Sequence, residues 1–76
     1  MNNPRRMRLA AIAAKLEDLR AELEDLRDEE QEAFDNMPES LQGSERGEIA
    51  EAAVYNIDSA VDSVQEAIDS IEEAQA

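Results

Sequence analysis

Apolar residues recur with helical spacing in the first half of the chain. Between residues 9 and 26 they step alternately by three and four positions, and the block Leu-Glu-Asp-Leu-Arg at 16–20 recurs at 23–27. Two apolar positions per seven residues, a and d of the heptad abcdefg, are typical of helices that pack along a seam. The a positions are Leu9, Leu16 and Leu23, and the d positions are Ile12, Leu19 and Leu26.

Capping and breaking residues predict that this helix covers residues 4–36. Asn3 is the expected N-cap, because its side chain can accept from the first turn, and Pro4 suits the first helical position. Pro38 disfavours helical backbone at Met37 and predicts the end. Glu30 weakens the seam because it occupies an a position; its carboxylate either reaches solvent or fixes the register of an oligomer.

The second half repeats the heptad with β-branched residues, and we predict a helix over 45–75 with Ser44 as its N-cap. The same steps of three and four recur, and Ala-Val-Asp-Ser-Val-Gln-Glu at 60–66 is followed by Ala-Ile-Asp-Ser-Ile-Glu-Glu at 67–73. The a positions are Val54, Val61 and Ile68; the d positions are Ile57, Val64 and Ile71; and the g positions are Ala53, Ala60, Ala67 and Ala74.

Residues 37–44 form a connector rich in turn residues and too short to separate two domains. A short connector makes the helices antiparallel neighbours, so e positions face e positions. Arg20 and Arg27 occupy e positions of the first helix, so along this edge we expect Arg27 near Glu51 or Asp58. The e positions of the second helix are Glu51, Asp58, Gln65 and Glu72. Along the other edge Arg8, Lys15, Glu22 and Glu29 face the alanine column, a flat surface that another helix could approach closely.

The predicted fold is therefore all-α, a single antiparallel two-helix coiled-coil hairpin. A chain of 76 residues in this form has a thin core, and domains of this size rarely gain more than a few kcal/mol from one core. We expect a homodimer that forms a four-helix bundle, with the a and d residues as its seam. The alternative is a marginal monomer that orders on binding a partner.

The composition points away from enzymatic chemistry. The chain has no cysteine and no histidine, which removes thiol chemistry, zinc-finger ligation and His-based acid–base catalysis. A serine nucleophile would need Lys15 as its base, and nothing places that lysine in a pocket. The acidic run 28–32 lacks the spacing and glycine of an EF-hand loop. We expect no enzyme activity, no cofactor and no metal.

The net charge of −13 is unevenly distributed. Residues 1–27 hold six basic and five acidic residues, whereas residues 28–76 hold one basic and 15 acidic residues. One exposed face of the second helix carries a row of carboxylates, Asp62, Glu66, Asp69 and Glu73. So acidic a chain would be repelled by nucleic acid. The row either keeps the protein soluble or binds a basic surface of another protein.

Apolar and aromatic residues gather near the predicted turn, and basic residues gather near the start. Phe34, Met37, Leu41 and Tyr55 either cover the open end of the hairpin or form a recognition surface. Arg5, Arg6 and Arg8 are expected beside Glu72 and Glu73, because both ends of an antiparallel hairpin lie together. The apolar run 9–14 is shorter than a secretory signal, which needs roughly 7–15 residues, or a membrane span of roughly 20. We expect a cytoplasmic protein without membrane contact.

The segment 29–48, which contains Asp35-Asn36-Met37-Pro38-Glu39-Ser40-Leu41-Gln42-Gly43-Ser44-Glu45-Arg46-Gly47-Glu48, followed by a degenerate Ile/Val-Asp-Ser helix, resembles small acidic proteins of bacteria and their phages. The resemblance covers most of the chain and implies no particular activity. In size and charge alone the chain is similar to anti-CRISPR and anti-restriction DNA mimics. We therefore expect a protein-binding module that masks a basic nucleic-acid-binding surface. The alternative is an oligomerisation module whose acidity serves solubility only.

Overall fold

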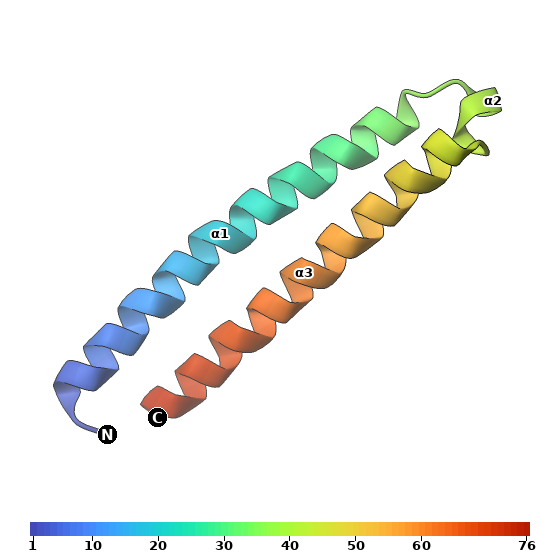
Figure 1. The fold of residues 1–76 in the computed structure, drawn as a ribbon. Coiled ribbons are helices and arrows are strands. Elements are labelled where there is room, and N and C mark those ends of the chain that lie inside the picture. Colours follow the sequence, from blue (N-terminus) through green and yellow to red (C-terminus); the bar gives the residue numbers. More distant parts are fainter.

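The computed structural model describes residues 1–76 as an all-helical hairpin. Helix α1 covers Asn3–Asp35, α2 covers Glu39–Gln42 and α3 covers Glu45–Gln75. Figure 1 shows α1 and α3 side by side and antiparallel along their whole lengths, with α2 at the turn and both chain termini at the opposite end. The predicted antiparallel pair of long helices is confirmed.

The start of α1 differs from the prediction by one residue. The N-cap is Asn2, whose Oδ1 accepts a hydrogen bond of 2.9 Å from the backbone N–H of Arg5. Asn3 is the first helical residue, and Pro4 follows it within the first turn. Because the first backbone N–H groups of a helix have no partner within the helix, Asn2 satisfies one of them in place of Asn3.

The connector contains a short helix, α2, that the heptad pattern did not predict. Helix α1 ends at Asp35, just before Pro38, and α3 begins after Ser44 as expected. The Ser44 side chain does not cap α3; its hydroxyl donates to the carbonyl of Leu41 at the end of α2. Gly47 is buried beneath this turn, and a Cβ there would lie 2.7 Å from the Leu41 carbonyl oxygen and closer still to Gln42.

Helix α3 packs on α1 through its predicted a and d columns. Val61 and Ile68 are buried, and Ile68 is only 1% exposed. Val54, Ile57, Val64 and Ile71 are half-buried along the same face. Toward the turn the columns continue into Gly47 and Ala50, which are also buried. The a and d positions of α3 therefore face α1 within the hairpin.

Helix α1 is rotated from the expected orientation. Its a residues Leu9, Leu16 and Leu23 are half-buried, but the next column to face α3 is e, with Ala13 buried and Arg20, Arg27 and Phe34 half-buried. The d residues Ile12, Leu19 and Leu26 are 47%, 51% and 53% exposed. The expectation that a and d together form the hairpin seam is therefore wrong for α1, where a and e form it. Arginine suits such a half-buried position, because its aliphatic stem can cover apolar surface while the charged group reaches solvent.

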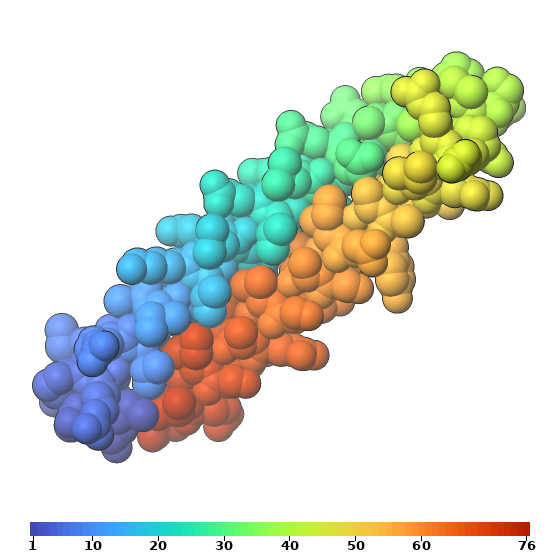
Figure 2. All heavy atoms as spheres, viewed as in Figure 1, coloured from blue at the N-terminus to red at the C-terminus, as the bar shows by residue number.

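The resulting molecule is an elongated rod (Figure 2). Its principal extents are 59 × 14 × 12 Å, and its radius of gyration is 17.3 Å, against about 11 Å for a compact domain of this length. Only five of the 76 residues are buried. No helix combines the length and apolar character that crossing a membrane requires.

Candidate protein-binding surfaces

The four predicted carboxylates of the second helix lie together on one exposed side of α3. Asp62, Glu66, Asp69 and Glu73, which we call the α3 acidic row, are all exposed, and none of them forms a salt bridge. Their positions alternate between b and f, so successive carboxylates are separated by about 5–6 Å of helical rise. The row is therefore a dense, uncompensated negative surface.

One carboxylate of this row is held by a hydrogen-bond network that begins on α1. Arg20 forms a salt bridge of 3.4 Å to Glu24 and donates to the side-chain oxygen of Gln65. The Gln65 amide nitrogen then donates to Asp69 over 2.9 Å. This contact joins two e positions, which face each other as the antiparallel arrangement predicts, and the network restricts the orientation of the Asp69 carboxylate.

A second e–e contact joins the helices closer to the turn. Arg27 Nη1 lies 2.8 Å from Asp58 Oδ1, and Arg27 Nη2 lies 3.3 Å from Asp28 Oδ1. Of the two predicted partners, the structure selects Asp58 over Glu51. The hydrogen bond to Asp58 raises the pKa of Arg27 above its ordinary value. The pair faces solvent, where such pairs fix orientation more than they add stability.

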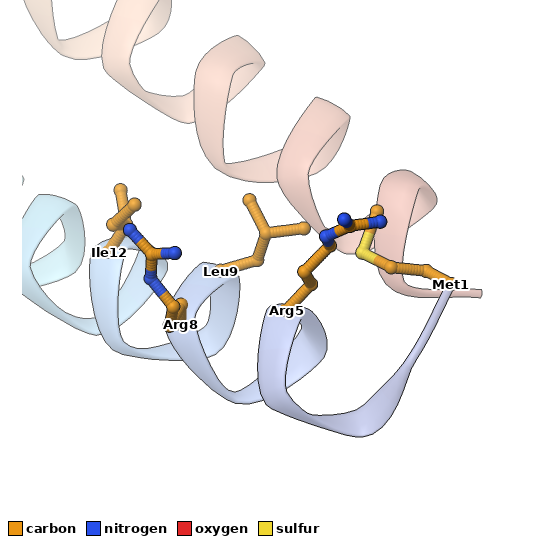
Figure 3. A pocket seen from close by; sticks show the side chains of 5 residues that line it. All are labelled: Met1, Arg5, Arg8, Leu9 and Ile12. Carbon is orange, nitrogen blue, oxygen red and sulfur yellow. The ribbon is translucent and has the colours of Figure 1, made fainter.

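The exposed d residues form a row of apolar side chains along α1. We call Ile12, Leu19 and Leu26 the α1 apolar strip. One groove beside it is lined by Met1, Arg5, Arg8, Leu9 and Ile12, which Figure 3 shows gathered near the chain end. A second groove is lined by Leu16, Leu19, Glu22, Leu23, Asp25, Leu26, Glu29 and Val64. Because Val64 belongs to α3, this groove runs along the junction of the two helices.

The part of α3 that borders this junction carries no charge. Its g and c columns from residue 53 to 74 contain only alanine, serine and asparagine; we call them the α3 small-residue face: Ala53, Asn56, Ala60, Ser63, Ala67, Ser70 and Ala74. The opposite edge of α3 is its e column, where Asp58 meets Arg27 of α1. The hairpin therefore has one broad side on which the α1 apolar strip and the α3 small-residue face are neighbours.

The residues predicted to gather at the turn are only partly brought together. Phe34 and Met37 are half-buried, whereas Leu41 is 39% exposed and Tyr55 is 73% exposed. Phe34 and Tyr55 line one groove with Arg27, Gln31, Glu51, Val54 and Asp58. Leu41 lies on α2, which contains no buried residue.

Two residues at the turn have structural roles that the hydrophobic pattern did not indicate. The Gln42 amide nitrogen donates to the carbonyls of Phe34 and Met37, at 3.3 and 3.2 Å, and ties α2 to the end of α1. Gly47 lets α3 pass closely beneath α2. A glycine inside the first turn of a predicted helix is a sequence signal for such a close approach.

The other polar residues singled out from the sequence are not gathered into a binding site. Arg5, Arg6 and Arg8 make no salt bridge to Glu72 or Glu73. Glu30 is half-buried at its a position and forms neither a hydrogen bond nor a salt bridge. No group of three or more acidic side chains is arranged to hold a metal ion. Lys15 is exposed on α1.

Comparison of the chain with protein-family models, curated protein sequences and solved structures finds no match. Function must therefore be argued from the two surfaces described above, the acidic row of α3 and the apolar side of the hairpin.

Proposed function

We propose that this chain is a non-enzymatic protein-binding module of the cytoplasm, which uses the α3 acidic row to occupy a basic surface on another protein. The observation that carries the proposal is the separation of the two sides of α3. All four carboxylates of the row are exposed without a basic partner, while the small-residue face bears no charge. The acidic row is thus free to face a partner when the apolar side of the hairpin is covered.

The class of partner follows from charge and spacing. Carboxylates about 5–6 Å apart along a helix offer a basic groove a regular series of anions, as a phosphate backbone does. Complementary charge of this kind accelerates association and selects partners more than it adds affinity. We propose a nucleic-acid-binding protein as the target, masked in the manner of a phage-derived DNA-mimic inhibitor such as an anti-CRISPR protein.

The test is capture of partners from a bacterial lysate by immobilised protein, with elution by double-stranded DNA. We expect the captured protein to be released by DNA and by high salt, and to be lost when Asp62, Glu66, Asp69 and Glu73 are all changed to lysine. A control variant with the same charge change uses four exposed carboxylates elsewhere: Glu17, Asp18, Glu32 and Glu39. Capture that survives the α3 reversal and shows no salt dependence would contradict the proposal.

A second candidate function is assembly alone, with the acidity serving solubility. The exposed α1 apolar strip favours it, because half-exposed leucines in a row are characteristic of a surface that another helix covers. In this case the chain dimerises into a four-helix bundle and binds no basic partner. In both cases we propose that the chain forms a homodimer, and loss of capture on reversal of the acidic row separates the two functions.

A further inference from the structure

The α1 apolar strip is flanked by a charge pattern that fits a second copy of itself. The g column beside the strip reads Arg8, Lys15, Glu22 and Glu29 from the N-terminal end, so its first half is basic and its second half acidic. All four side chains are exposed and none forms a salt bridge within the hairpin. In an antiparallel pair of helices g residues face g residues, and the two halves of this column would then complement each other.

The register of the charges agrees with the register of the apolar residues. If two α1 helices pack antiparallel with Leu19 of each copy at the centre, Ile12 meets Leu26 of the second copy at both ends. The same centre places Lys15 within one residue of Glu22 of the second copy, and Arg8 within one residue of Glu29. A parallel pair would instead place Lys15 beside Lys15 and Glu22 beside Glu22, which is unfavourable.

The grooves and α3 are compatible with this pairing. The groove near the chain end is flanked by Arg5 and Arg8, and the central groove by Glu22, Asp25 and Glu29. In an antiparallel pair, the basic N-terminal end of α1 in one copy lies over the acidic second half of α1 in the other copy. Since α3 lies beside α1, the same two-fold axis brings the α3 small-residue faces of the two copies together. Alanine and serine there let the helices approach closely, with no charge to desolvate.

The solvent-accessible area of the hairpin is larger than that of a globular chain of the same mass. The hairpin exposes 5556 Å², whereas a globular monomer of 8.5 kDa exposes about 4,700 Å². The excess of about 900 Å² on one chain is comparable to the roughly 800 Å² that each partner buries in a standard interface.

We propose that a second copy of this chain covers the α1 apolar strip, with the two α1 helices antiparallel about a two-fold axis at Leu19. This arrangement rests on the proposed dimerisation and specifies it. Leu19 contacts Leu19 of the second copy, Ile12 contacts Leu26 of the second copy, and four ion pairs, two Lys15–Glu22 and two Arg8–Glu29, border the strip. The carboxylates of the α3 acidic row remain outside this interface.

Single-cysteine variants of the full chain test the arrangement, since the natural sequence has no cysteine. A disulfide needs Cα atoms within about 7 Å. Under oxidation Leu19→Cys should convert to a covalent dimer. Ile12→Cys alone should not, because the two copies of residue 12 are about 21 Å apart along the helix. A mixture of Ile12→Cys and Leu26→Cys should give the crossed dimer.

Charge reversal supplies an independent measurement. Lys15→Glu should raise the dissociation constant about tenfold, because two weak ion pairs are lost and become repulsive. The double variant Lys15→Glu/Glu22→Lys should restore the dimer. The arrangement is overturned if the wild type is dimeric while Leu19→Cys fails to cross-link, or if Ile12→Cys cross-links to itself. A wild type that stays monomeric at every concentration would overturn dimerisation itself, and the lysate capture described above still tests the acidic row.

Discussion

At the scale of single residues, the turn depends on one glycine more than on its apolar side chains. Gly47 is buried where α3 passes beneath α2, and there is no room for a Cβ between it and the carbonyls of Leu41 and Gln42. Gln42 closes the same turn through hydrogen bonds to the end of α1. The Tyr55 side chain is 73% exposed and the Leu41 side chain 39% exposed, so neither is buried at the turn as Gly47 is.

We expect Gly47→Ala to destabilise the hairpin by about 1–3 kcal/mol, because the new methyl group collides with backbone that cannot move freely. In an unobstructed helix the same change stabilises by about 1 kcal/mol. The sign of the change in unfolding free energy therefore tells whether α2 obstructs this position. Gly43→Ala is the matched control, since a Cβ there meets nothing within 4 Å. Urea unfolding followed by circular dichroism measures both variants. A stabilising Gly47→Ala would show that α2 does not pack on α3 as described.

At the scale of elements, the two long helices and their antiparallel packing were predictable, whereas the rotation of α1 was not. In α3 the a and d columns are the only apolar columns besides alanine, and they form the seam. In α1 the large apolar residues at a and d define one apolar face, and the sequence pattern does not indicate which part of this face packs on α3. The contacts of Arg20 with Gln65 and of Arg27 with Asp58 accompany a rotation that buries Ala13 and exposes Leu19. Helix α2 has four residues, about one turn, too few for periodicity to reveal.

The unequal burial within α3 gives a second prediction. Ile68 is 1% exposed, so Ile68→Ala should cost about 2–5 kcal/mol through lost burial and the cavity that remains. Ile49→Ala, at a residue 62% exposed on the same helix, should change stability by no more than about 0.5 kcal/mol. Chemical unfolding of both variants at one protein concentration compares them. Equal costs would mean that the heptad register of α3 is not the one that packs.

At the scale of the whole molecule, the α3 acidic row and the α1 apolar strip occupy different sides of the rod. The α3 acidic row faces outward, and the α1 apolar strip lies beside the uncharged small-residue face. A net charge of −13 would oppose association if it were spread evenly. Here the self-complementary g column of α1 and the neutral face of α3 leave one side suited to a second copy and another suited to a basic partner.

The acidic row of α3 was predictable from the sequence, because the heptad register of this helix defines it. The positions of Asp62, Glu66, Asp69 and Glu73 on one face follow from helical spacing alone, and the structure places all four at the surface. The apolar side was not predictable as a free surface, because its exposure depends on the rotation of α1. The hydrogen bonds by which Gln65 links Arg20 to Asp69 could not be predicted, because they depend on how the two helices face each other.

The central claim is that the half-exposed leucines of α1 are covered by a second copy. Sedimentation equilibrium of the wild type and of Leu19→Glu over a range of concentrations tests it most directly. Leu19 does not belong to the hairpin seam, so this variant should keep its helical content, and Ala21→Glu controls for the added charge on the outer face of α1. We predict twice the chain mass for the wild type and for Ala21→Glu, and the mass of one chain for Leu19→Glu. A wild type that sediments as a single chain throughout, or a Leu19→Glu variant that remains dimeric, would contradict the account.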